Sequence, residues 1–137
     1  MVDELTTQHA VVALQYAKAN IVTAQTDTDL ALAGGNTIAV MPKAGSVVGV
    51  AVNMSALLTA GSVTVEVHKD GTELAEEAGP VLTLTTAVQE SYASVRRGAI
   101  KFTAGTGLGV SYSSSTDIEA SNTLDLDAVL YIAFDND

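Results

Sequence analysis

The feature that most constrains this chain is a two-residue alternation of apolar and polar side chains, repeated in short stretches from about residue 20 onward. Successive side chains of a β-strand point to opposite faces, so this alternation is typical of strands with one buried face. The clearest inward sets are Val48, Val50, Val52 and Met54 in residues 45–54, and Leu124, Leu126, Ala128, Leu130, Ile132 and Phe134 in residues 124–134. About eight such stretches with turns between them predict an all-β sandwich or barrel.

Further strands are expected over shorter stretches, which are residues 62–68, 81–86, 92–95, 99–103 and 108–113. Asp70-Gly71 follows the first of these and is a strong hairpin signal. Residues 19–32 are expected to form one or two strands interrupted around 27–29. Residues 37–41 form another short strand, which Pro42 ends because proline lacks a ladder donor. We expect no helix between residues 20 and 137.

The segment before this pattern is ambiguous. Leu5, Val12, Tyr16 and Ala19 fit a helical stripe, whereas Val12, Leu14 and Tyr16 fit a strand equally well. We interpret residues 1–19 as an N-terminal arm and residues 20–137 as one β-sandwich domain, which is an ordinary length for a single domain.

Charge limits the classes of partner. The chain has 16 acidic and 6 basic residues, a formal net charge of −10. Nucleic-acid binding depends on phosphate neutralisation by Lys and Arg, so no direct DNA or RNA role is expected, and anionic membranes are disfavoured for the same reason. No apolar run approaches the roughly 20 residues that span a bilayer. The acidic N-terminus lacks the basic start of a signal peptide. We therefore expect a soluble protein made in the cytoplasm.

The surface is expected to be partly covered by another protein chain. Charged residues make up only 16% of the sequence and hydrophobic residues 47%, whereas a typical soluble domain is about 25% charged. Residues 129–134 are apolar on both faces of their predicted strand. A strand of this kind is typically covered from both sides.

Residue types that serve catalysis or metal binding occur in a few places. They are the glycine-rich stretch 105–109, His68 with Glu66, the pairs Asp27/Asp29 and Asp125/Asp127, and the serines 113–115. The glycines lie between two predicted strands, whereas a dinucleotide site needs them before a helix, so a tight turn is favoured. Solvated strand faces explain the aspartate pairs and the histidine, and no base accompanies the serines. We expect no enzyme activity, no cofactor and no metal.

Three segments carry a resemblance to a known family. They are residues 42–52 continuing through 55–67 and 69–71, residues 100–110, and the closing strand that ends in Tyr131-Ile132-Ala133-Phe134. Together they resemble the antiparallel jelly-roll, tumour-necrosis-factor-like domain of tailed-phage structural proteins, which include capsid decoration (cement) proteins and fibre heads. The resemblance covers residues 20–137. Because little more than one jelly roll and an arm is present, it is most similar to a decoration protein.

The resemblance implies a non-enzymatic bacteriophage protein that binds the major capsid protein on the capsid exterior of the virion and stabilises the shell. It also implies a homotrimer, with Val129, Tyr131 and Phe134 expected near the trimer axis. The alternative is a receptor- or glycan-binding head domain of a tail fibre or spike.

Two groups of residues are candidates for capsid docking. The first is apolar and lies in the arm, consisting of Leu5, Val12, Leu14 and Tyr16. Disordered tails are usually polar, so an apolar arm is expected either to bind a partner or to pack on its own sandwich as an extra strand. The second group is basic, consisting of Arg96, Arg97 and Lys101.

Overall fold

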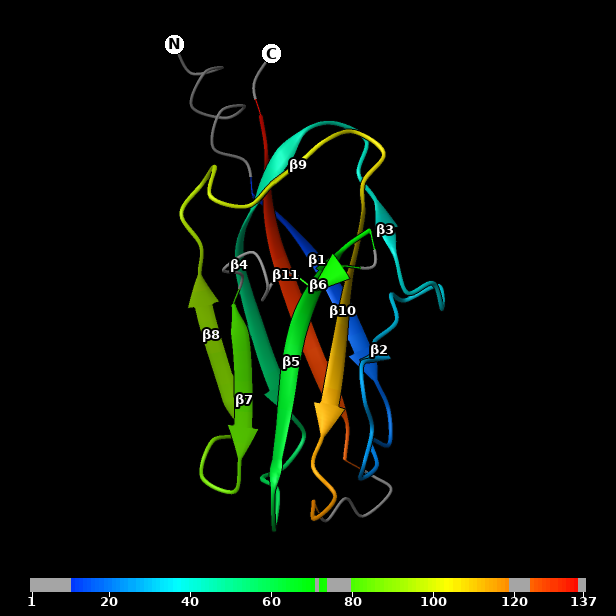
Figure 1. Cartoon of the computed structure of the whole chain (residues 1–137), viewed down its shortest axis with the longest axis vertical. Helices are drawn as coiled ribbons and strands as arrows, with labels where there is room; N and C mark the ends of the chain where they lie inside the picture. Colours follow the sequence, from blue (N-terminus) through cyan, green and yellow to red (C-terminus); the bar gives the residue numbers. More distant parts are fainter. Residues whose placement is uncertain (1–10, 71, 74–79, 119–123, 136–137) are drawn as a thin grey trace.

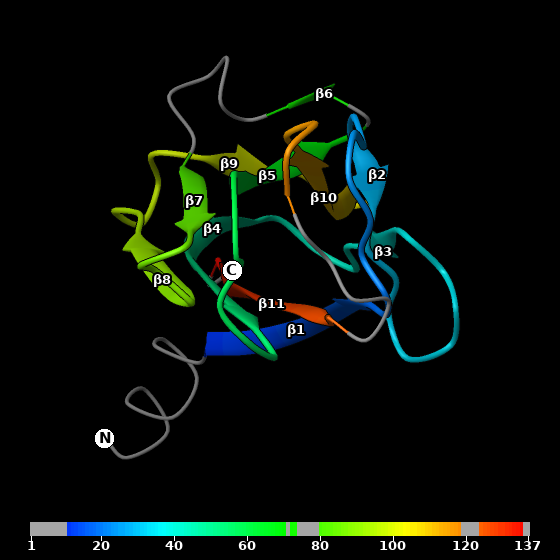
Figure 2. The ribbon, with the colours of Figure 1, turned by 90° about the horizontal axis from the view of Figure 1, so that it is seen from below.

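The computed structural model describes residues 11–70, 72–73, 80–118 and 124–135 (Figure 1). Its described residues form two antiparallel β-sheets that face each other (Figure 2). Sheet A contains β1 (Val11–Lys18), β4 (Gly45–Met54), β8 (Glu90–Ser94), β9 (Lys101–Phe102) and β11 (Leu126–Phe134). Sheet B contains β2 (Thr28–Asp29), β3 (Ala39–Val40), β5 (Ser62–Lys69), β6 (Thr72–Glu73), β7 (Val81–Thr85) and β10 (Gly107–Ser114).

The strand order is that of a jelly roll. Sheet A runs β1-β11-β4-β8, and in sheet B β10 lies between β2 and β5, with β7 on the other side of β5. The chain changes sheet between β4 and β5, between β7 and β8, and between β10 and β11, so sequence neighbours face each other across the core. The predicted all-β jelly-roll sandwich is confirmed. In the part of the chain that the structure describes, no helix is long and apolar enough to span a membrane.

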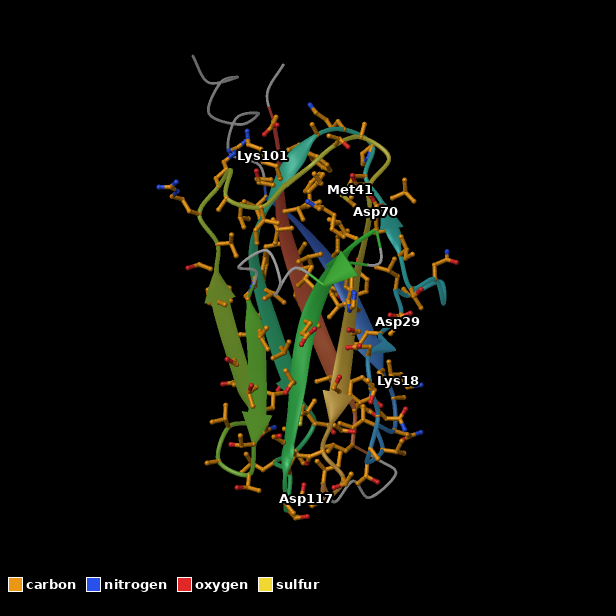
Figure 3. All side chains as sticks on the ribbon, viewed as in Figure 1. Lys18, Asp29, Met41, Asp70, Lys101 and Asp117 are labelled. Carbon is orange, nitrogen blue, oxygen red and sulfur yellow. The ribbon has the colours of Figure 1, made fainter. Side chains whose placement is uncertain are left out.

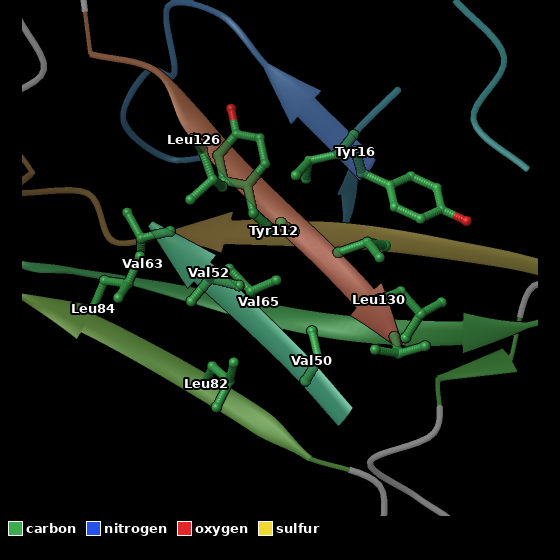
Figure 4. Packing of buried hydrophobic residues seen from close by; sticks show 14 of the residues in the cluster. Tyr16, Val50, Val52, Val63, Val65, Leu82, Leu84, Tyr112, Leu126 and Leu130 are labelled. Atoms are coloured by element: carbon green, nitrogen blue, oxygen red, sulfur yellow. The ribbon is translucent and has the colours of Figure 1, made fainter. Parts of the chain in front are cut away.

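The core lies between the two sheets and is made by the alternation that the sequence shows (Figure 4). Sheet A contributes Val50, Val52, Leu126 and Leu130 among others, and sheet B faces them with Val63, Val65, Leu82, Leu84 and Tyr112. Each of these side chains is almost completely buried. At about 25 cal/mol per Å² of apolar surface, this shared interior is the main source of stability.

The prediction that Val48 faces the core is wrong, because a β-bulge shifts the alternation of side chains. In the ladder between β4 and β11, Tyr131 pairs with Gly49 but Ile132 pairs with Val47, so Val48 has no partner opposite it. An extra residue in one strand reverses which side chains face inward beyond that point. Val47 is therefore fully buried, and the expected core residue Val48 is only half-buried.

The N-terminal segment is the second difference from the sequence-based interpretation. Residues 11–18 of the expected arm form β1, and all eight pair with β11 at the edge of sheet A. The strand alternative is therefore the one that the structure shows for this part, while residues 1–10 lie outside the described residues. In residues 19–32 the only strand is Thr28–Asp29, at the place where an interruption was expected. Gln25 and Asp27 instead reach β10 by bonding their amides to Ser114 and Ser113 hydroxyls.

Candidate functional site

The outer face of sheet A carries an unusual set of side chains. Because β1, β11, β4 and β8 lie side by side, their outward residues form rows across the sheet. One row contains Gln15, Val129, Ala51 and Tyr92, the next contains Ala13, Tyr131, Gly49 and Ser94, and a third contains Ala17, Asp127, Asn53 and Glu90. We call Gly49, Ala51, Tyr92, Val129 and Tyr131 the apolar strip.

The strip is hollowed beside Tyr92, over the small side chain of Ala51 in its central strand. Gly49 and Ala51 of β4 lie between Tyr92 on one side and Val129 and Tyr131 on the other. The resulting hollow has a volume of about 500 Å³, and its lining includes Ala51, Tyr92 and Val129. Tyr92 is 60% exposed, and its ring meets that of Tyr131 edge to face, with centroids 6.4 Å apart. An aromatic ring that exposed is suited to contact with another molecule.

One rim of this hollow is acidic and polar. Asn53, Glu90 and Asp127 line it beside the apolar strip, and all three side chains are exposed. A second hollow of about 540 Å³ shares Asp127 and Val129 with the first and continues toward β1. No Lys, Arg or His lines either hollow. The described outer face of sheet A therefore combines one exposed aromatic edge with hydrogen-bond acceptors and negative charge.

The three residues expected at a trimer axis do not share one surface. Val129 and Tyr131 belong to the apolar strip. Phe134 lies beyond the bulge, where its half-buried ring packs edge to face on Phe102, with centroids 6.2 Å apart. Phe134 therefore contributes to the core of its own chain.

The four apolar docking candidates of the arm also do not form one surface in the part of the chain that the structure describes. Leu5 lies outside the described residues. Val12 is 37% exposed, Leu14 packs against the core, and Tyr16 is buried with its hydroxyl donating to the Leu108 carbonyl at 2.7 Å. Burial raises the pKa of Tyr16 from 10.0 to about 12. Tyr16 is therefore a structural residue in this fold and has no surface to offer a capsid, which corrects its assignment as a docking residue.

The basic candidates are exposed and lie together. Arg96 and Arg97 follow β8, and Lys101 begins β9. The Arg97 guanidinium donates to the Phe134 carbonyl at 2.7 Å, close to where Val11 pairs with Ala133. The basic candidates and the start of β1 therefore lie at the same end of the sandwich (Figure 1).

Several of the remaining chemical candidates lie around His68 on the outer face of sheet B. His68 Nε2 is hydrogen-bonded to the Ser111 hydroxyl, but Ser111 is completely buried and presents nothing to a substrate. A hollow of about 320 Å³ beside His68 is lined by Asp27 and Asp29. Glu66, on the same strand face, has one buried carboxylate oxygen with no hydrogen-bond partner within the described part of the chain. Across the described residues, no three His, Asp or Glu side chains are grouped to hold a metal ion.

The serines and glycines likewise serve local structure. The Ser114 hydroxyl donates to the Val22 carbonyl at 2.7 Å, and that of Ser115 accepts from the Ser62 amide at 3.1 Å. Gly105 has φ +89°, which a tight turn before β10 requires and other residues rarely adopt. The expected turn is confirmed at Gly105, whereas Gly107 and Gly109 belong to strand β10.

Sequence reasoning missed three residues of the apolar strip, which are Tyr92 and Ala51 at the hollow and the buried Gly49 beneath the Tyr92 ring. Two of them were visible as small residues alternating with Val50 and Val52. What the sequence lacks is the strand order, which brings β8 and β11 to either side of β4.

Comparison with known proteins gives a fold and no family. No family model matches the chain, and the search of curated proteins finds no match. A chain in the acid-stable capsid structure of Helicobacter pylori bacteriophage KHP30 has a TM-score of 0.51 at 15% identity, over 91% of this chain and 89% of that one. The PRD1 vertex protein P5 has a TM-score of 0.48 at 10% identity, over 90% of this chain and 96% of that one. A family 35 carbohydrate-binding module from Clostridium thermocellum gives 0.40 at 13% identity, over 91% and 99%. The likeness to the KHP30 chain supports the shared fold.

Proposed function

We propose that this chain is a non-enzymatic structural protein of a phage virion, a decoration protein that binds the exterior of the capsid as a homotrimer. The shared fold with a chain of the KHP30 capsid structure supports a virion context. The observation that carries the proposal is the apolar strip on the outer face of sheet A, which suits burial against other copies.

The strip offers an exposed aromatic anchor for self-association. A tyrosine side chain has an accessible area of about 200 Å², so the 60% exposure of Tyr92 amounts to about 120 Å². Removing that area from water contributes about 3 kcal/mol per copy before the entropy cost of association is subtracted. Val129 and Tyr131 of β11, which lies on the other side of β4 from Tyr92, are half-buried and add a smaller area.

Light scattering after gel filtration tests the trimer. Three chains of 14.0 kDa give about 42 kDa, and we expect that mass at micromolar concentration. Tyr92→Ala should shift the mass toward the monomer, whereas Val40→Ala, which removes a 67% exposed side chain in sheet B, should leave it unchanged. A wild-type monomer would contradict the trimer.

The mechanism of such a protein is mechanical. Binding across junctions between copies of the major capsid protein, it ties neighbours together against internal pressure, and repetition over many sites adds avidity to modest contacts. We propose that residues 1–10, with Leu5, and the basic side chains Arg96, Arg97 and Lys101 contact the shell.

Co-sedimentation with capsids that lack this chain tests the docking. The informative deletion removes residues 2–10, because removing residues 11–18 would also remove β1 and its eight paired residues. We expect the shortened chain to stay folded and trimeric but to sediment less with capsids. Full-length protein that does not sediment with capsids would contradict the decoration role.

The second candidate is a receptor- or glycan-binding head, and the hollow beside Tyr92 specifically favours it. An exposed ring can stack on a sugar face. The Glu90 and Asp127 carboxylates can accept hydrogen bonds from sugar hydroxyl groups, and the Asn53 amide can donate or accept them. The two candidates compete for one surface, because a trimer that buries Tyr92 closes this hollow. Saturable glycan binding by the assembled protein, lost in Tyr92→Ala, would favour the head domain.

A further inference from the structure

The positive charge of this acidic chain is gathered at one end of the sandwich. All six Lys and Arg residues lie in the described part, and five of them surround the ends of β4, β5, β8 and β9. These five are Lys43, Lys69, Arg96, Arg97 and Lys101, and we call them the basic end. Lys101 pairs with Ser46 of β4, and the Lys69 ammonium donates to the Lys101 carbonyl at 3.3 Å. Lys43 and Lys101, which are 58 positions apart in the sequence, therefore belong to one surface.

The opposite end has the reverse charge. Asp117, Asp125, Asp127 and Glu90 lie there, and Lys18 is the cation placed among them (Figure 3). At the basic end the described acids are Asp70, Asp135 and Glu73, which pairs with His68 next to Lys69. Asp70 is committed to its own fold, since its carboxylate accepts from the Gly107 amide at 2.8 Å. The described groups thus make one end positive and the other negative on a chain whose net charge is −10.

Hydrogen bonds hold the turn at the centre of the basic end, which spans residues 95–100. Ala99 N donates to the Arg96 carbonyl at 3.0 Å, and Gly98 N donates to the Ser46 hydroxyl at 3.1 Å. Both flanks of the turn are bonded to β4, through Val95 to Val48 and Ile100 to Val47. Gly98 has φ +90°, which fixes the reversal of the chain. A turn ordered in advance loses less entropy when its side chains bind.

We infer that the basic end is a docking surface for an acidic protein surface, one that presents clustered Asp and Glu side chains. Guanidinium groups pair with carboxylates through parallel hydrogen bonds, and complementary charge speeds and orients association. A long polyphosphate would extend past this end and meet the negative remainder of the chain. A compact patch of carboxylates meets mainly the five cations of the basic end.

This inference rests on the proposed function for its partner, which is then the capsid surface. Three single charge reversals test it, and each changes the net charge equally. Arg96→Glu and Lys101→Glu act at the basic end, and Lys18→Glu is the matched control at the other end. All three side chains lie at the surface or close to it, so we expect wild-type urea midpoints and wild-type mass.

The first measurement is co-sedimentation with capsids that lack this chain. At about 50 mM salt we expect Arg96→Glu and Lys101→Glu to weaken binding by about tenfold and Lys18→Glu by less than about twofold. The difference should shrink at about 300 mM salt, where charge is screened. Equal binding by all three variants, or an equal loss in Lys18→Glu, would overturn the inference while leaving the decoration role intact.

The second measurement separates the inference from the proposed function. The wild-type chain and the variants are passed over immobilised poly-L-glutamate and over immobilised duplex DNA. We expect retention on polyglutamate that Arg96→Glu loses and Lys18→Glu keeps, whether or not capsids bind. No retention on polyglutamate overturns the inference, and so does stronger retention on DNA that depends on Arg96.

Discussion

The hydroxyl of Tyr16 offers a sharp test of how β1 is held in the sandwich. It donates to the Leu108 carbonyl at 2.7 Å, which links the edge strand of sheet A to a strand of sheet B. Both residues are buried, with Tyr16 1% and Leu108 0% exposed. Tyr16→Phe keeps the ring and removes only this bond.

The expected loss at neutral pH is that of one buried hydrogen bond. Such a bond contributes about 1.5 kcal/mol, and more where the remaining carbonyl finds no other partner. For a chain of 137 residues, the entropy of unfolding converts this loss into a decrease in Tm of about 5 °C. A residue that serves only to dock on a capsid would show no such decrease.

The loss should also vanish at high pH. Burial raises the pKa of Tyr16 to about 12 in the folded chain, whereas the unfolded chain keeps the ordinary value of 10.0. Below pH 10 the phenol is protonated in both states, so its contribution is complete. Above pH 10 the unfolded state ionises first, and the folded state loses about 1.4 kcal/mol by pH 11. Tyr16→Phe has no phenol to ionise, so the two proteins should become equally stable near pH 11.

Urea unfolding followed by circular dichroism between pH 7 and 11 measures both effects. The protein concentration is held constant, because subunit association also changes apparent stability. Burial raises the pKa of Tyr112 as well, but that residue is present in both proteins and cancels in the difference. Tyr92→Phe removes a hydroxyl from a 60% exposed side chain and should change stability by less than about 0.5 kcal/mol. A Tyr16→Phe loss that stays constant up to pH 11 would refute the reasoning.

Three further changes test the sandwich itself. Gly45→Ala would push a methyl group into the Ala133 backbone carbonyl and should lower the free energy of unfolding in urea by at least about 2 kcal/mol. Gly34 has open space around it, so Gly34→Ala should leave that free energy nearly unchanged. Equal effects of the two substitutions would contradict the packing around Gly45. Leu130→Ala should lower the free energy of unfolding by about 2–5 kcal/mol, because it empties a fully buried position. Leu57→Ala, at a 47% exposed position, should lower it by less than about 1 kcal/mol. A similarly small effect of Leu130→Ala would argue against a core at that position. Chelators should leave the Tm unchanged, and a fall of more than about 5 °C would reveal a metal site.

The alternation of side chains was sufficient to predict the sandwich, because burial of one face is a local property of each strand. Val50, Val52 and Leu130 are buried as expected. Val48 is not, since the bulge that turns it out of the core depends on where β11 pairs. Tyr16 shows the same limit. Its segment fitted a helix and a strand equally well, and the exposed edge of β11, which β1 covers, decided between them.

The candidate surfaces were less predictable, because they are assembled from distant strands. Arg96, Arg97 and Lys101 stood out as neighbours in the sequence, but Lys43 and Lys69 join them only through the ladders of β4 and β5. Val129 and Tyr131 were expected at an interface, while Tyr92 reaches them only because β4 lies between β8 and β11. Strand order is a non-local property, so it cannot be predicted from the spacing of residues within one sequence.

The two proposed surfaces are compatible because they face different directions. The apolar strip lies on the outer face of sheet A, and the basic end lies where β4 begins and where Lys101 of β9 is placed (Figure 3). Copies packed by their strips around an axis parallel to these strands would hold their basic ends in one plane, facing the same way. Each trimer would then present three positive surfaces to the shell at once, and three modest contacts made together bind far more tightly than one. The acidic ends, with Asp117 and Asp125, would point away from the shell and toward solvent. In the proposed arrangement, the apolar strip would supply the lateral contact of the trimer, and the separation of charge would set the orientation of that trimer on a capsid.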